Sequence, residues 1–387
     1  MANISLQIIK ENAKNCLLEL PTSYGKTRIA LELMKKKNPN KILIVIPRLV
    51  LVNNWKEEIK KWGCTQYTSK ISFSTYVSFP KHAGEWDLVI FDECHHLSER
   101  CRECLRYFTI NSTILLSATV KRELRQEFTY LFKPLQVYRI TTKKAIEEGK
   151  LPEPTVYLIP LQLDRTTEDC VIVKNKNKGN PITIRFNERW NYKGVKNRTI
   201  YIKCTQQQYY SDISSLIEWY RPKVYSELYK NLFLRTSGDR LKWLSDQKTT
   251  FIYNLLRFLS KERTLTFCNS ILQTEILGKY CINSKNGVAS RAFLSAFNEG
   301  KISHITACNM LDEGMNLVNC RVGVYASLNS SERMIKQKLG RLLRHPNPII
   351  IIPYFVGTRD EEIVKTMCED YNPELIKVVN NYTEIQL

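Results

Sequence analysis

Short apolar runs rich in β-branched residues alternate with helical stretches along most of this chain. In the first third, residues 16–20, 41–47, 88–93 and 113–119 have the pattern of buried strands, and residues 28–37 form a helix-like stretch with one apolar side. Continuous apolar runs of this kind are typical of parallel strands that are covered on both faces. The pattern therefore predicts an α/β fold, in which helices cover both faces of a parallel sheet.

The same alternation returns in the second half, where helical stretches at residues 273–280 and 333–344 lie between strand-like runs. A chain of 387 residues is long enough for two domains. We place the boundary just ahead of a helical segment at residues 142–149, which gives domains of residues 1–140 and 141–387. The strand-like runs of the second half are residues 155–161, 263–268, 304–308, 322–327 and 348–355.

The charge of the chain indicates a polyanionic partner. Lys and Arg number 58 against 38 Asp and Glu, so the net charge is +20. A folded surface this basic attracts nucleic acid, an anionic membrane face or an acidic protein. A lysine-rich background composition would give the same excess of basic residues. The sequence motifs must therefore distinguish a polyanionic partner from this alternative.

One region, at about residues 163–244, interrupts the alternation of strands and helices. It begins with a basic, hairpin-like stretch in which aromatic side chains are interleaved, and it continues with aromatic helices. We interpret it as an insertion in the second domain. Two readings of its basic stretch stay open, a wedge or grip on a nucleic-acid duplex and a solvated hairpin. The residues concerned are Arg185, Arg189, Trp190 and Lys193.

The cysteines and the lengths of the apolar runs indicate where in the cell the protein is expected. The 12 cysteines are scattered through strand-like and helix-like segments, and charges interrupt the first residues, so we expect no secretory signal and reduced thiols in the cytoplasm. The longest apolar runs are far shorter than the about 20 residues that cross a bilayer. Cys101 and Cys104 form a C-x-x-C pair near two histidines, but no second pair follows at zinc-finger spacing, which favours thiols over zinc.

A phosphate-binding loop is predicted at residues 20–27, where the sequence LPTSYGKT follows a strand and opens a helix. Backbone N–H groups at such a helix N-terminus surround phosphates. Lys26 would neutralise the terminal phosphates, and the Thr27 hydroxyl would hold Mg²⁺. Leu20 stands where the strict phosphate-loop pattern has its first Gly. The prediction therefore depends mainly on the location of this segment between a strand and a helix.

Paired carboxylates follow a second buried strand, at Asp92 and Glu93. Ligands of parallel sheets bind at the carboxyl ends of the strands, where these side chains would lie. Asp92 would then bind Mg²⁺, and Glu93 would orient and deprotonate an attacking water. A strand that merely ends in solvated acids is the alternative, but the presence of both signals in this order favours a site for phosphate hydrolysis.

The residues of the first half resemble those of superfamily 2 helicases of the DExH type. Residues 21–27 resemble motif I, residues 47–52 followed by Trp55 resemble motif Ia, and Ser74-Thr75-Tyr76 stand where motif Ib is expected. The sequence DECH at residues 92–95 resembles motif II, and SAT at residues 117–119 resembles motif III.

The second half continues the same series in the same order. Residues 266–270 resemble motif IV, residues 306–316 motif V, and residues 337–344 match the pattern Q-x-x-G-R-x-x-R of motif VI. The resemblance therefore covers nearly the whole chain and implies two tandem RecA-like domains. Residues 142–149 are similar to those of the DNA repair and recombination branch, which includes phage helicases.

The resemblance also implies roles for single residues. ATP with Mg²⁺ would bind between the domains, with Thr27 and Asp92 as the metal-binding side chains. The residues implied in catalysis are Lys26, Asp92, Glu93, Gln337, Arg341 and Arg344. The residues implied in nucleotide binding are Gln7, Thr22, Ser23, Tyr24, Gly25, Lys26, Thr27, Asp92, Gly314, Asn316, Arg341 and Arg344.

Two further groups follow from the resemblance. Ser117 and Thr119, with Ala118 between them, would couple the sites, because the two hydroxyls would bond to the motif II carboxylates. The residues implied in contacts to nucleic-acid phosphates are Arg48, Ser74, Thr75, Asn269 and Thr306.

Three positions depart from the family pattern. Ser23 stands where motif I usually has Gly, which predicts a conformational cost in the loop. Asn316 replaces a frequent Asp of motif V. Gln7 is the candidate for the adenine-reading glutamine, but it lies close to motif I, and a plain glutamine on a helix surface is the open alternative.

These residues predict an ATP-dependent helicase or translocase that moves along DNA, single-stranded or branched, and unwinds or remodels it. The alternatives are an ATP-switched clamp on DNA, the motor subunit of a restriction or defence complex, and an RNA helicase. One chain can form the ATP site between its own domains, so we expect a monomer, to which a partner protein could bind.

Overall fold

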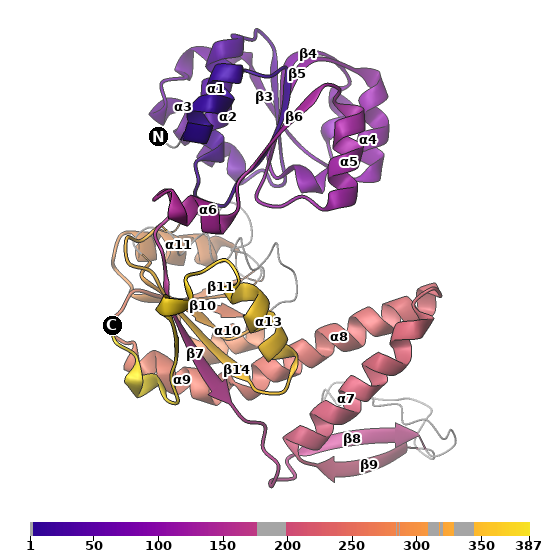
Figure 1. The fold of residues 1–387 in the computed structure, drawn as a ribbon, viewed down its shortest axis with the longest axis vertical. Coiled ribbons are helices and arrows are strands. Elements are labelled where there is room, and N and C mark those ends of the chain that lie inside the picture. The colour runs from indigo at the N-terminus through magenta and orange to yellow at the C-terminus, as the bar shows by residue number, and fades with distance from the viewer. Residues whose placement is uncertain are drawn as a thin grey trace.

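The computed structural model describes residues 3–175, 199–283, 285, 287–308, 317, 320–328 and 344–387. Two parallel sheets with helices on both faces dominate it, as the alternation of strands and helices predicts (Figure 1). Helix α6 (Thr142–Glu147) lies in the connection between the last strand of the first sheet and the first strand of the second.

The first sheet has six strands in the order β3-β2-β4-β5-β1-β6, and every pairing in it is parallel. Its strands are β1 (Asn15–Glu19), β2 (Ile42–Ile46), β3 (Ile71–Thr75), β4 (Gly84–Phe91), β5 (Phe108–Ser117) and β6 (Leu135–Arg139). Its helices are α1 (Asn3–Glu11), α2 (Lys26–Lys37), α3 (Leu51–Lys61), α4 (Glu99–Cys104) and α5 (Arg122–Leu131).

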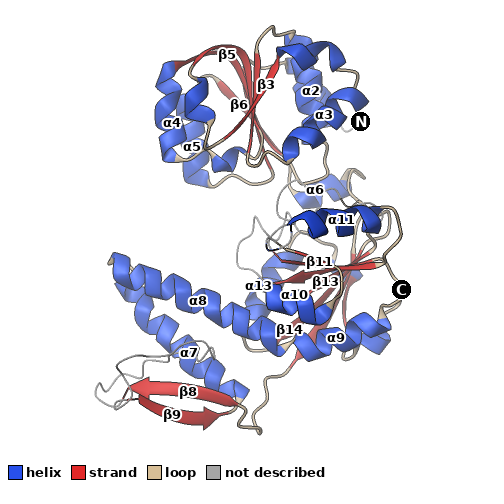
Figure 2. Cartoon of the chain, turned by 180° about the vertical axis from the view of Figure 1, so that it is seen from behind, coloured by secondary structure: helices blue, strands red, loops and turns tan. Residues whose placement is uncertain are grey.

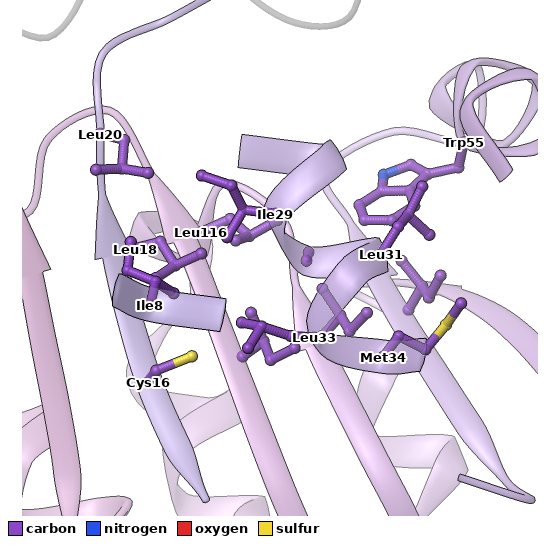
Figure 3. Close-up of a cluster of buried hydrophobic side chains, with 14 of the residues drawn as sticks. Ile8, Cys16, Leu18, Leu20, Ile29, Leu31, Leu33, Met34, Trp55 and Leu116 are labelled. Carbon is purple, nitrogen blue, oxygen red and sulfur yellow. The ribbon is translucent and has the colours of Figure 1, made fainter. Parts of the chain in front are cut away.

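Apolar side chains seal both faces of this sheet. Helices α1, α2 and α3 cover one face, and α4 and α5 cover the other (Figures 1 and 2). On the first face, Ile8, Ile29 and Leu33 pack onto Leu18 and Leu116 of the central strands (Figure 3). All five residues of β1 are buried, which holds the end of that strand in a fixed place.

The second sheet has seven strands in the order β11-β12-β10-β13-β14-β7-β15, and its pairings are also parallel. Its strands are β7 (Thr155–Leu161), β10 (Thr264–Cys268), β11 (Cys281–Ile282), β12 (His304–Cys308), β13 (Val322–Tyr325), β14 (Ile349–Phe355) and β15 (Ile376–Val378). Helices α11 (Gly287–Asn298) and α13 (Arg359–Cys368) cover one face, and α9 (Thr249–Phe258) and α10 (Ile271–Leu277) cover the other.

The predicted insertion is present as a separate arm between β7 and α9. An antiparallel pair, β8 (Cys170–Asn175) and β9 (Thr199–Cys204), is followed by two long helices, α7 (Gln206–Tyr220) and α8 (Glu227–Gln247). The arm projects from the second sheet (Figures 1 and 2). At its base, the buried Lys248 ammonium lies 2.9 Å from the Asp360 carboxylate, and this ion pair ties the end of α8 to α13.

Several predictions fall outside the described residues or need correction. The helix expected at residues 333–344 lies almost wholly outside them, as do Arg185, Arg189, Trp190 and Lys193. Strands β3, β6, β11 and β15 were not expected from the sequence. No helix of the described part is both long and apolar enough to span a membrane.

Candidate nucleotide site

The predicted phosphate loop lies at the carboxyl end of β1, between that strand and α2. Leu20 N–H donates to the carbonyl of Ser117 at the end of β5, which anchors the start of the loop (3.1 Å). Gly25 has φ +98° and stands directly before the first residue of α2. The N–H groups that open α2 therefore point out of the helix at the loop, which favours an anion there.

Ser23 has a left-handed backbone, with φ +69°. This conformation costs a residue with a Cβ about 1–2 kcal/mol relative to the right-handed region. The conformational cost predicted for a serine at a position that usually holds glycine is therefore confirmed.

Lys26 begins α2 and folds back over the loop. Its Nζ donates to the carbonyls of Leu20 (3.0 Å) and Pro21 (3.4 Å). Desolvation lowers the pKa of Lys26, and the charges of Glu93 and Asp92 oppose that shift. A phosphate would offer this ammonium stronger acceptors than two neutral carbonyls do.

Asp92 and Glu93 directly follow β4, one strand away from β1, with β5 between them. Hydrogen bonds from several segments hold Asp92. Its N–H donates to the Val45 carbonyl (2.8 Å), Trp55 Nε1 donates to its Oδ2 (2.9 Å), and the Tyr76 hydroxyl donates to its carbonyl (2.7 Å). Both carboxylates thus stand at the same edge of the sheet as the phosphate loop, as predicted.

Glu93 has a left-handed backbone with φ +51°, and its Oε2 lies 3.4 Å from His95 Nδ1. His95 Nδ1 also lies 3.1 Å from the Ser117 hydroxyl. Motif III therefore reaches motif II through the imidazole of His95. The residue missed by the sequence analysis is His95, which was treated only as a letter of the DECH motif.

The predicted contacts of motif III need correction. The Ser117 hydroxyl donates to the Thr119 carbonyl at 2.8 Å and contacts His95, whereas a carboxylate partner was expected. The Thr119 hydroxyl is buried and makes no hydrogen bond to any of the described residues, so its predicted bond is wrong for this structure. Ala118 is also buried.

Arg344 connects the second half to the loop. Its Nε donates to the Ser23 hydroxyl at 3.0 Å, which places one guanidinium of predicted motif VI at motif I. The other predicted nucleotide residues of the second half, Gly314, Asn316, Gln337 and Arg341, lie outside the described residues.

Gln7, the candidate for the adenine-reading glutamine, lies on the surface of α1. Its side chain is exposed on α1, and its Nε2 donates to Glu11 Oε1 one turn further on (2.8 Å). This contact is the one expected for the alternative, a glutamine on a helix surface, and the adenine-reading role stays a prediction.

The predicted phosphate contacts divide by exposure. Arg48 is exposed in the turn between β2 and α3, and Thr75 and Asn269 are partly exposed. Ser74 is buried and donates to the Thr75 carbonyl, and Thr306 is fully buried and donates to the Thr274 carbonyl. The predicted contacts of the Ser74 and Thr306 side chains are therefore corrected, because neither hydroxyl reaches the surface.

The residues at the loop fit a magnesium nucleotide. Thr27 is in the first turn of α2, and Asp92 supplies a carboxylate at the same edge of the sheet. The Thr22 hydroxyl is buried in the loop and has no hydrogen-bond partner among the described residues. A buried hydroxyl without a partner in this loop is a group that an oxyanion or its hydration water can satisfy.

Two parallel sheets with helices on both faces have the architecture of tandem RecA-like domains, the fold of helicase domains. Residues 1–122 match the family described as Type III restriction enzyme, res subunit. The chain is 24% identical over 373 residues to the DNA 3'-5' translocase XPB2 of Sulfurisphaera tokodaii, and the match covers 90% of this chain and 79% of that protein.

Solved structures share the fold. The Hef helicase domain of Pyrococcus furiosus aligns with a TM-score of 0.53 at 14% identity, over 94% of this chain and 97% of that one. A putative HsdR subunit of a type I restriction enzyme from Vibrio vulnificus aligns with a TM-score of 0.59 at 17% identity, over 97% of this chain and 66% of that one. The chain is thus an ATP-dependent helicase or translocase, and as such a nucleic-acid-dependent ATPase.

Proposed function

We propose that this protein is an ATP-driven motor that moves along DNA and separates or remodels its strands. The observation that carries the proposal is the meeting of three groups at one edge of the first sheet. Lys26 opens α2, Asp92 and Glu93 follow β4, and Arg344 reaches Ser23 from the second half of the chain. These are the groups that phosphoryl transfer requires.

Each group has a role in the proposed reaction. When bound, Mg²⁺·ATP would supply the phosphoryl group, and the cation would stabilise negative charge on the phosphate oxygens. Lys26 neutralises the terminal phosphates, and Thr27 and Asp92 hold the metal. Glu93 accepts the proton of the attacking water, while its contact with His95 keeps the carboxylate aimed.

The second half completes the proposed site. Arg344 and Arg341 neutralise the charge that develops on the phosphoryl oxygens, an effect of about 10³–10⁵ in rate for an arginine in this role. Gln337 positions the water, and Gly314 and Asn316 line the nucleotide. A cleft that tightens around ATP and loosens after hydrolysis would change the grip on the strand in each cycle.

DNA is the proposed substrate in preference to RNA. The curated relative is a DNA translocase, and the net charge of +20 suits a phosphate backbone. Arg48, Thr75 and Asn269 are the exposed or partly exposed candidates for phosphate contacts, which position a strand without reading its sequence.

Finer assignments are part of the same proposal. We propose domain limits at residues 140 and 141, a DECH-box subtype, and a place in DNA repair or recombination. We also propose a monomer in the cytoplasm. The twelve cysteines form no disulfide, which agrees with that location.

A motor subunit of a restriction complex is the second candidate. It is favoured by the match of residues 1–122 to the res-subunit family. The nuclease would then be a separate chain, so affinity purification from the native host should bring a nuclease with it. Full translocation and strand separation by the isolated chain would count against this candidate.

The water-activating role of Glu93 gives the first prediction. Glu93→Gln should lower DNA-stimulated ATP turnover by about 10²–10⁴-fold, because the amide cannot accept the proton, and should leave ATP binding intact. Lys26→Ala should weaken binding and turnover together. Steady-state hydrolysis and equilibrium binding of a fluorescent ATP analogue measure the two effects.

Glu85→Gln is the matched control, because Glu85 is an exposed glutamate at the opposite end of the same strand β4. It removes the same charge far from the loop and should turn over ATP like the wild type. Normal turnover by Glu93→Gln would show that another group activates the water.

A further inference from the structure

Two buried aromatic side chains donate hydrogen bonds to Asp92 from segments far away in the sequence. Trp55 Nε1 lies 2.9 Å from Asp92 Oδ2, and the Tyr76 hydroxyl lies 2.7 Å from the Asp92 carbonyl. The first bond fixes the carboxylate, and the second fixes the main chain that carries it. Neither residue has a role in the reaction described above.

The surroundings of Trp55 make its position rigid. Its side chain is only 3% exposed and belongs to the apolar cluster that includes Ile29 and Leu31 of α2. In Figure 3 the indole reaches from α3 toward Leu31. An indole has one donor and no acceptor, so its N–H can serve only an oxygen such as Asp92 Oδ2.

Tyr76 is held as firmly on the other side of Asp92. It is 6% exposed, and its ring stacks against Phe91 with 6.4 Å between centroids. The Cys101 thiol donates to the Tyr76 carbonyl at 3.1 Å. The hydroxyl therefore cannot turn away from Asp92 without a shift of packed neighbours.

Hydrogen bonds to a metal-binding carboxylate affect how it binds a cation. A carboxylate has about four lone-pair sites, so the same group can accept the Trp55 N–H and also bind a cation. Partners of this kind orient a metal-binding carboxylate and set its affinity, and their loss typically weakens metal binding 10–100-fold.

We propose that Trp55 and Tyr76 are positioning residues for Asp92, and that Trp55 in particular holds its carboxylate in the orientation that binds the divalent cation of the nucleotide. This inference rests on the proposed function, since it assigns a supporting role within the same ATP site. It extends the site to the helix α3 and to the turn after β3.

The test is the affinity of the full-length chain for Mn²⁺ in the presence of ADP, measured by the loss of the free-ion signal in electron paramagnetic resonance. Trp55→Phe keeps an aromatic ring in the apolar cluster and removes the N–H donor together with part of the indole. It should weaken Mn²⁺ binding about 10-fold or more. The affinity for ADP in the presence of a chelator should stay unchanged, which a general disturbance of the loop would not allow.

Trp62→Phe is the matched control. Trp62 directly follows α3, and its Nε1 donates to Glu58 Oε2 at 2.6 Å rather than to Asp92. This variant loses the same kind of indole–carboxylate bond in the same helix region and should bind Mn²⁺ like the wild type. Tyr76→Phe is the second test variant, and it should also weaken Mn²⁺ binding. It serves as the test if Trp55→Phe does not fold.

The outcomes separate the two levels of the argument. Wild-type affinity for Mn²⁺ in a folded Trp55→Phe protein, or in Tyr76→Phe where only that variant folds, would overturn the positioning role. Equal weakening by Trp62→Phe would also overturn it. A wild-type chain that binds neither ADP nor Mn²⁺·ADP would instead overturn the proposed function on which the inference rests.

Discussion

Burial decides which single residues can respond to pH, and His304 is the clearest case. Desolvation lowers the pKa of His304 to about 4, below the ordinary 6.5 of a histidine, and its Nε2 lies 3.1 Å from the Thr266 hydroxyl. Below pH 6.5, His304 binds a proton in the unfolded chain, whereas in the folded chain it stays neutral until about pH 4. The neutral ring therefore costs no stability above pH 6.5, and stability falls as the pH drops from 6.5 toward 4.

A comparison with His304→Gln tests this pH dependence. Urea unfolding of both proteins at pH 7, 6 and 5 should show that the wild type loses more stability on acidification. The difference can reach about 1.4 kcal/mol per pH unit for one proton. Parallel losses in the two proteins would mean that His304 is protonated equally in the folded and unfolded chains.

Single residues also show where sequence reasoning reaches its limit. Lys26, Asp92 and Glu93 could be placed because each directly follows or opens an element whose pattern is strong. Thr306 could not, since a strand buried on both faces gives no alternation that distinguishes a hidden hydroxyl from an exposed one. His95 and Trp55 act through partners distant in the chain, which a local motif does not reveal.

At the scale of elements, the contact of α10 with β12 depends on a glycine. Gly278 ends α10, and a Cβ built there would lie 2.8 Å from Thr306 Cγ2 of β12. Gly278→Ala should therefore push the C-terminal end of α10 away from β12. The expected decrease in the free energy of unfolding is about 1–3 kcal/mol.

Gly238→Ala serves as the control for that prediction, and its effect should have the opposite sign. Gly238 is inside α8, where an added Cβ meets open space, so alanine should stabilise the helix by about 1 kcal/mol. Chemical denaturation of both variants gives the two values. Wild-type stability of Gly278→Ala would show that α10 can move off β12 without cost.

The elements that the sequence analysis missed share a physical cause. Strands β3 and β6 are at the two edges of the first sheet, and only one residue of each is buried. An edge strand with partly exposed faces lacks the continuous apolar run that marks a central parallel strand. The central strands were predicted within a few residues because both of their faces are buried.

At the scale of the whole molecule, the chain brings one arginine of its second half to a loop of its first. Arg344 and Ser23 are separated by 321 positions, yet their side chains are 3.0 Å apart. The order of the motifs predicts this meeting. The sequence also predicts an insertion where the arm lies, but not its anchor at Lys248 and Asp360. A site assembled from both halves is what allows hydrolysis to change how the molecule grips a strand.

The most direct test of an ATP-driven nucleic-acid motor is ATP hydrolysis titrated with four ligands of matched length. These are single-stranded DNA, duplex DNA, a forked DNA junction and single-stranded RNA. We predict strong stimulation by a DNA ligand, with an affinity that falls steeply as salt rises, because phosphate contacts release counterions. Equal, unstimulated turnover with all four ligands would contradict the coupling of this ATP site to nucleic acid.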